Sequence, residues 1–410
     1  MKKGLFAAAI VALIATASQA GEFQPVGNGS VGLGGAGVAR NYGAFAPYWN
    51  PAGLAFAKKT VSVGTSAQVG VQPGGTLSEA LDGLEDLDLT PATDAEALST
   101  RDDVINRLGM LENGFLRATA GGGLGVQIKQ FGFGVFGSFE AAATAVADTT
   151  NVNFPTTATP SPANPFSTDG PLTVHNTSTV TIDGFALIEV PLSYGHELDL
   201  KEYGMLGLGM SAKYLQGEAT TSTKRIFTTD GTDIDALSSD DLTDDLSDNR
   251  TSSSSFGIDL GTMWKPKSPL PLTLAVVGKN LNAPTFKTVA GGKIKIDRQV
   301  RAGFSAELLP WLELSADVDV LSNRTLISGL KSQVLGGGAE LHPFDCLKLR
   351  VGGYKNLASS ADGAVTAGLS LGIPWLYLDV DGAYGLGTVK YDGSSYPSEA
   401  KVQVGLNVMF

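Results

Sequence analysis

The chain has 410 residues, of which 52 are Gly and one is Cys, and its formal net charge is −12. This acidic balance argues against a nucleic-acid partner, because phosphate backbones select basic surfaces. The lone Cys346 excludes an intrachain disulfide. So much glycine beside abundant apolar residues favours crowded strands over disorder.

The first 20 residues have the composition of an export signal. Two lysines supply its positive end, residues 5–17 its apolar run and residues 18–20 a small-x-small cleavage site. We therefore expect residues 1–20 to be removed, so that the mature chain begins near Gly21. No later stretch offers about twenty uninterrupted apolar residues, so any membrane crossing is expected to use strands.

Residues 21–58 form a glycine-rich segment before the first predicted strand. Glycine permits tight turns and close backbone packing. The segment is too irregular to face lipid, where unpaired backbone groups are costly, so we expect a plug, or hatch, inside a barrel. The residues expected to shape the hatch are Gly32, Gly34, Gly35, Gly37, Asn50, Pro51 and Gly53.

Two motifs superficially suggest a cofactor or catalysis. Residues 32–37 read G-x-G-x-x-G, but no strand precedes them to open a dinucleotide-binding unit. Residues 368–372 read G-x-S-x-G, but strand alternation runs straight through them. His175, His196 and His342 have neither a triad signature nor metal-ligand spacing. We expect no enzyme, no cofactor and no metal.

Segments of about ten residues alternate apolar and polar, the pattern of strands with one apolar face. In the last segment, Val402, Val404, Leu406 and Val408 share a face with the terminal Phe410. A final aromatic of this kind resembles the signal read by the outer-membrane assembly machinery. The predicted strands are 59–71, 117–129, 130–146, 180–196, 203–226, 252–265, 271–285, 293–309, 311–322, 331–342, 345–355, 363–373, 375–387 and 399–410.

Alternate connections between these strands are very short, whereas the others include three long loops, residues 72–116, 147–179 and 227–251. A membrane barrel shows this asymmetry because one rim faces the periplasm and the other the outside. A soluble sandwich has no reason for it. We predict an all-β protein, a transmembrane barrel of about 14 antiparallel strands over residues 59–410, in the outer membrane of a Gram-negative bacterium.

The long loops suggest two kinds of site. Leucines at helical spacing in residues 72–116 predict short helices, either packed over the rim or forming a lid that captures a ligand or docks a partner. Residues 227–251 are acidic, which favours a solvated loop; a divalent-cation site there would lack EF-hand spacing. The residues expected to line an apolar pocket, or merely to pack together, are Phe45, Tyr48, Trp49, Leu77, Leu81, Leu84 and Leu108.

Charged residues recur on the face opposite the apolar one. A charge on the lipid face costs roughly 2–4 kcal/mol near the membrane midplane, so these side chains are expected to face the lumen. There they would pair across the barrel or hold the hatch. They are Glu140, Glu189, Asp297, Arg301, Glu313, Asp317, Asp319, Glu340, Lys348, Arg350, Asp379 and Asp381.

Several stretches resemble a known family. They are SVGLGGAGVA at residues 30–39, YWNPAGL at 48–54, and RAGF at 301–304 leading to Trp311 and the strand at 317–319. They look like the long-chain fatty-acid transporter superfamily of outer-membrane proteins (FadL, or OmpP1), in particular its conjugal transfer TraF-like branch.

The resemblance implies a monomeric barrel whose N-terminal segment is a hatch in the lumen. It also implies passage of long-chain fatty acids or similar hydrophobic molecules, with outer-membrane lipids and the assembly machinery as partners. The TraF-like branch leaves a second function open, an accessory of conjugal transfer or secretion that acts through its external loops.

Overall fold

The computed structural model describes most of the chain. The described residues are 22–87, 94–112, 114–152, 176–227, 249–359, 362–391 and 393–410. The predicted export signal, residues 1–20, lies outside them, as does most of the acidic loop 227–251.

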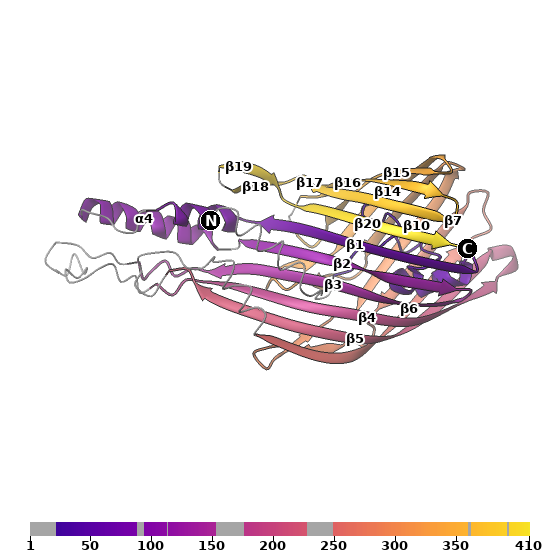
Figure 1. Cartoon of the computed structure of the whole chain (residues 1–410), viewed down its shortest axis with the longest axis horizontal. Coiled ribbons are helices and arrows are strands. Elements are labelled where there is room, and N and C mark those ends of the chain that lie inside the picture. Colours follow the sequence, from indigo (N-terminus) through magenta and orange to yellow (C-terminus); the bar gives the residue numbers. More distant parts are fainter. Residues whose placement is uncertain are drawn as a thin grey trace.

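Fourteen strands close into one antiparallel barrel (Figure 1). Each strand pairs with its neighbours in chain order, and β1 closes the ring by pairing with β20. The predicted fold class and strand number are confirmed. The barrel strands are β1 (Val61–Gly74), β2 (Phe115–Ile128), β3 (Phe131–Val146), β4 (Thr179–Asp199), β5 (Met205–Arg225), β6 (Arg250–Lys265), β7 (Leu272–Lys279), β10 (Gln299–Leu309), β11 (Leu312–Asp319), β14 (Val334–Phe344), β15 (Leu347–Asn356), β16 (Ala364–Ile373), β17 (Leu376–Gly385) and β20 (Ala400–Met409).

The outside of the barrel is apolar and the inside polar. On β17, Leu378 is 51% exposed, whereas the next residue, Asp379, is 3% exposed. On β20, Val402 is 51% exposed and Gln403 only 1%. A soluble protein would bury the leucine and the valine. A barrel in lipid turns them to hydrocarbon and keeps the carboxylate in its lumen.

Short turns lie at one rim and long connections at the other (Figure 1). At the short-turn rim, Lys129 and Gln130 alone join β2 to β3. At the other rim, α4 extends beyond the barrel strands (Figure 1). The predicted asymmetry and the helices within 72–116 are confirmed. The long connections contain α3 (Leu77–Glu85), α4 (Asp94–Met110) and the hairpins β8 (Thr285–Lys287) with β9 (Lys293–Lys295), β12 (Asn323–Arg324) with β13 (Lys331–Ser332), and β18 (Thr388–Tyr391) with β19 (Ser394–Pro397).

The connection between β7 and β10 corrects the sequence-based prediction. β7 ends at Lys279 and β10 begins at Gln299, and the hairpin β8–β9 between them is not part of the barrel sheet. Asp297 therefore lies outside the barrel strands, where it forms an ion pair with Arg324 at 2.7 Å rather than facing the lumen. Alternation continues through this stretch because the hairpin also has one apolar face, on which Phe286 is buried.

The N-terminal segment, residues 22–58, contains only α2 (Ala46–Trp49) and the 3-10 helix η2 (Pro51–Phe56); another 3-10 turn, η3 (Lys201–Tyr203), joins β4 to β5. Asn50 caps η2 by accepting a hydrogen bond from the N–H of Ala52 at 3.0 Å. Its amide donates to the carbonyl of Thr262 in β6 at 3.2 Å. Among the described residues, no helix has the length and apolar character needed to cross a membrane.

Candidate functional site

The N-terminal segment contacts inward-facing side chains on several sides of the barrel. The side chain of Gln24 accepts a hydrogen bond from Gln68 of β1 at 3.2 Å. The backbone N–H of Val31 donates to Gln403 of β20 at 3.4 Å. Together with the bond from Asn50 to β6, these contacts join the segment to three different strands of the barrel.

Glycines of the segment meet glycines of the barrel wall. Gly34 has φ +64°, and a Cβ there would lie 2.2 Å from the carbonyl oxygen of Gly353 in β15. A Cβ on Gly336 of β14 would lie 1.9 Å from the carbonyl oxygen of Gly34. Backbone therefore packs on backbone, which requires glycine on both surfaces. Gly35 has φ +83° with nothing within 4 Å of its Cβ position, so glycine there serves only the turn.

The other predicted hatch glycines are enclosed as well. On Gly32, a Cβ would lie 2.4 Å from a carboxylate oxygen of β17. On Gly37 it would lie 2.6 Å from the Trp49 indole, and on Gly53 it would lie 2.0 Å from a backbone carbonyl oxygen. Pro51 begins η2. These positions have no room for a side chain, so the glycine spacing reflects tertiary packing rather than a phosphate-binding loop.

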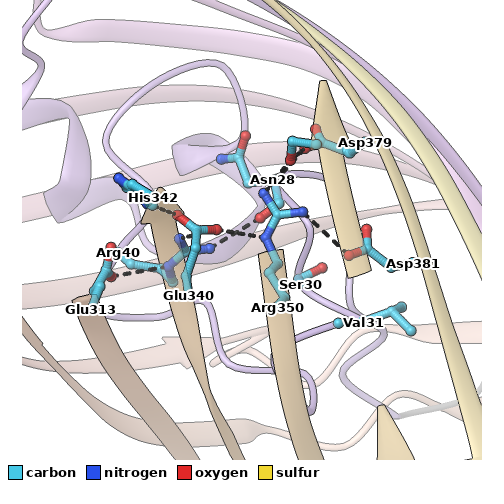
Figure 2. Close-up of polar contacts among 12 residues, drawn as sticks. Asn28, Ser30, Val31, Arg40, Glu313, Glu340, His342, Arg350, Asp379 and Asp381 are labelled. Atoms are coloured by element: carbon cyan, nitrogen blue, oxygen red, sulfur yellow. Dashed lines mark hydrogen bonds and ion pairs between the residues drawn. The ribbon is translucent and has the colours of Figure 1, made fainter. Parts of the chain in front are cut away.

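Arg40 of the segment connects it to the charged wall (Figure 2). Its guanidinium lies 3.1 Å from Glu313 of β11 and 3.0 Å from Glu340 of β14. Arg350 of β15 lies 2.5 Å from Glu340 and 3.3 Å from Asp381 of β17. Burial disfavours the charge of Arg40, but the two carboxylates beside it raise the pKa of Arg40 above its ordinary value.

Sequence reasoning missed Arg40, although a signal was present. It is the only charged residue between positions 23 and 57. An isolated charge in an otherwise uncharged segment that is buried in a lumen needs a partner of opposite sign. The predicted inward carboxylates supply that partner.

Asp317 of β11 holds the backbone of the segment. Its carboxylate accepts hydrogen bonds from the N–H of Gly37 at 2.7 Å and from the N–H of the next residue at 2.9 Å. Asp319, the next inward residue on β11, binds Arg301 of β10 at 2.6 Å. The predicted lumen charges on β10 and β11 therefore include both a direct contact with the segment and an ion pair within the wall.

The remaining predicted charges also face inward. Glu189 of β4 lies 2.6 Å from Lys213 of β5. Asp379 of β17 accepts a hydrogen bond from Ser370 and lies 3.2 Å from Arg350. Lys348 lines a charged cavity at the short-turn end, described below.

Glu22 is a second anchor that sequence reasoning missed. It forms an ion pair with Arg117 of β2 and accepts a hydrogen bond from Ser332 of β13 at 3.1 Å. Arg117 also lies 2.9 Å from Glu140, a predicted lumen residue of β3. Burial opposes ionisation of Glu22, but the charge of Arg117 outweighs it and lowers the pKa of Glu22 to about 2.

A cavity of about 320 Å³ lies at the short-turn end of the lumen. Arg40, Glu313, His342 and Lys348 are among the residues that line it. These walls are charged, so the cavity suits water and ions rather than an apolar molecule.

The residues predicted to line one apolar pocket are divided between two packed clusters. The first contains the loop residues Leu77, Leu81, Leu84 and Leu108. The second contains Phe45, Tyr48 and Trp49. The leucines pack α3 and α4 onto the barrel rim, and the aromatic residues form the core of the N-terminal segment around Phe136 of β3.

The two described histidines contact other polar side chains. The ring of His342 contacts Glu340 at 2.6 Å, and that of His196 contacts Tyr194 at 3.4 Å. His175 is outside the described residues. Across the described ranges, no group of three or more His, Cys, Asp or Glu residues is placed to hold a metal ion.

These features define a class of protein, the outer-membrane β-barrel of 14 antiparallel strands. The toluene transporter TodX of Pseudomonas putida has this fold, with a TM-score of 0.51 and 11% identity over 95% of this chain and 99% of that chain. A FadL homologue of Pseudomonas aeruginosa has a TM-score of 0.50 and 13% identity over 96% and 99% of the two chains. The monoaromatic hydrocarbon channel CymD has a TM-score of 0.50 and 12% identity over 95% and 99%. At these identities the likeness establishes the fold alone.

The sequence gives the family. Residues 47–319, about two-thirds of the chain, match the family described as "F plasmid transfer operon, TraF, protein", and the chain belongs to that family. A search of curated protein sequences found no significant match. The expected FadL-like fold and TraF-like branch are thus confirmed.

Proposed function

We propose that this barrel passes small hydrophobic molecules across the outer membrane, with the N-terminal segment acting as the hatch that keeps the lumen closed to water. The main support is the anchoring of the segment to opposite walls, by Arg40 on β11 and β14 and by Glu22 on β2. A closed lumen of this kind suits a channel for specific apolar cargo rather than an open aqueous pore. Neighbours in fold that are described as toluene and monoaromatic hydrocarbon channels agree with this class of cargo.

Uptake by whole cells tests the proposal. Cells without the barrel, cells with the wild type and cells with a variant lacking residues 76–112 are given labelled toluene, a labelled long-chain fatty acid or a labelled disaccharide. We expect the wild type to accelerate uptake of at least one apolar compound and to leave disaccharide entry unchanged. Apolar uptake no faster than in cells without the barrel would refute the function.

The variant lacking residues 76–112 tests whether α3 and α4 cover the entrance. Both helices bury leucines in one cluster with Leu116 of β2, so their removal exposes apolar surface at the outer rim. We expect altered toluene or fatty-acid uptake, whereas unchanged uptake would exclude a lid role for these helices and leave the channel function intact.

We propose as a second candidate an accessory role in conjugal transfer or secretion, which the family match supports. Here α4, which extends beyond the barrel strands, is the surface that a partner protein would meet (Figure 1). The same deletion, measured by mating frequency, separates the two roles. Loss of DNA transfer with normal apolar uptake supports the accessory role, and normal transfer counts against it.

A further inference from the structure

The inward face of β4 and β5 bears an apolar patch where a barrel lumen is ordinarily polar. Phe185 and Leu187 of β4 and Leu215 and Ala219 of β5 are each at most 3% exposed. Gly217 lies between the last two at the same inward phase. The patch is therefore a recess with apolar walls and a floor without a side chain.

A side chain from the β8–β9 hairpin fills this recess. The ring of Phe286 lies 5.5 Å from that of Phe185, centroid to centroid. A Cβ on Gly217 would lie 2.4 Å from the Phe286 ring. Ile294 and Ile296 of the same connection, and Leu326 of the connection between β11 and β14, complete the cluster. An aromatic ring therefore occupies a site whose walls fit an aromatic ring.

The hairpin that brings this ring is short. It consists of two three-residue strands outside the barrel sheet, and an isolated hairpin of this size is marginally stable. A hydrogen bond joins it to the barrel: the N–H of Lys287 donates to the hydroxyl of Ser253 in β6 at 2.9 Å. Lys287, Lys293 and Lys295 are exposed on the face opposite Phe286. The hairpin is thus apolar toward the lumen and basic toward solvent.

The hairpin also starts beyond the point where the pairing between β6 and β7 ends. β6 pairs with β7 only over residues 260–264, although it pairs with β5 along its whole length. Above that point, the side chain of Asn282 caps the free edge of β6. It donates to the carbonyl of Phe256 at 2.7 Å and accepts from the N–H of Ile258 at 3.1 Å. The hairpin can therefore move without breaking the ladder of the barrel.

We propose that the recess between β4 and β5 is a binding site for a small aromatic hydrocarbon of about the size of a benzene ring, and that Phe286 occupies it when no ligand is bound. The proposal deepens the proposed function by giving its cargo a place and a size. A ligand must displace Phe286. The apparent affinity is therefore the affinity of the vacant site multiplied by the fraction of molecules in which Phe286 has left it.

Equilibrium binding of labelled toluene to the purified full-length barrel in detergent, corrected with empty micelles, tests this site. Phe286→Ala should bind toluene at least about tenfold more tightly than the wild type, because its recess is permanently vacant. Adding Gly217→Val to Phe286→Ala should abolish the gain, because the new side chain fills the recess. Phe256→Ala, which removes a lipid-facing ring 63% exposed on β6, is the matched control and should bind like the wild type.

Equal affinity of Phe286→Ala, Phe256→Ala and the wild type would overturn the proposal, as would a gain that survives Gly217→Val. If Phe286→Ala fails to fold, Ser253→Ala decides instead. It loosens the hairpin and keeps its ring, so affinity should rise about two- to threefold, and an unchanged affinity overturns the site.

Cell uptake distinguishes failure of the site from failure of the proposed function. Toluene uptake by the wild type without any gain in binding by Phe286→Ala would leave the channel function and remove this site. Tighter binding by Phe286→Ala with no uptake of apolar compounds by the wild type would leave the site and remove the channel function.

Discussion

Replacing Gly34 by Ala should displace the N-terminal segment, whereas the same change at Gly35 should not. Both residues have positive φ, so alanine costs about 1–2 kcal/mol of backbone strain at either position. Only at Gly34 does the new Cβ meet the wall, 2.2 Å from the carbonyl oxygen of Gly353 and 2.8 Å from backbone atoms of Gly337. These atoms belong to two paired strands and cannot rotate away.

Overpacking of this kind costs about 1–3 kcal/mol beyond the shared strain. This energy changes the ratio of barrels with the segment in place to barrels with the segment displaced by a factor of roughly 5–150. The assay is entry of a disaccharide into liposomes that contain the refolded barrel. Gly34→Ala should leak, whereas Gly35→Ala and the wild type should remain tight. Equal leakage of the two variants would show that backbone contact with β14 and β15 does not hold the segment.

Three further predictions concern charge and assembly. Arg350→Met should destabilise the barrel by about 3–5 kcal/mol in urea unfolding, because it leaves buried carboxylates unpaired. Adding Asp381→Asn should recover part of the lost stability. An unfolding midpoint of Arg350→Met equal to that of the wild type would contradict this prediction. The pKa of Glu22 is lowered from 4.5 to about 2. Its ionised carboxylate therefore contributes about 3 kcal/mol to the free energy of unfolding above pH 4.5, and this contribution is lost as the pH falls to 2. Glu22→Gln and the wild type should therefore differ in stability at pH 7 and converge near pH 2; a constant difference would refute the assignment. Deleting Phe410 should slow assembly of the heat-resistant barrel in pulse-chase experiments, and normal assembly would exclude its signal role.

The barrel could be predicted from the sequence because its determinants are local. A strand places successive side chains on opposite faces, so alternation through Leu378 and Asp379 defines a lipid face and a lumen face wherever the strand lies. Short turns at alternate connections, such as Lys129-Gln130, then place the short turns at one rim of the barrel and the long connections at the other. The glycine-rich stretch could likewise be placed away from lipid, because its irregular backbone would leave unpaired polar groups in hydrocarbon.

The contacts that define the site could not be predicted in this way. Arg40 and Glu340 are separated by 300 positions in the sequence, and only closure of the ring with its particular register brings them to 3.0 Å. Alternation could not distinguish the β8–β9 hairpin from a barrel strand, because a hairpin folded into the lumen and a barrel strand both have one apolar face. Tertiary structure decided which face Phe286 covers, and that Leu77 and Trp49 belong to separate clusters. The sequence by itself determined the barrel and its faces, since backbone geometry sets the periodicity. What fills the lumen was decided by packing between distant segments, since that depends on the closed barrel.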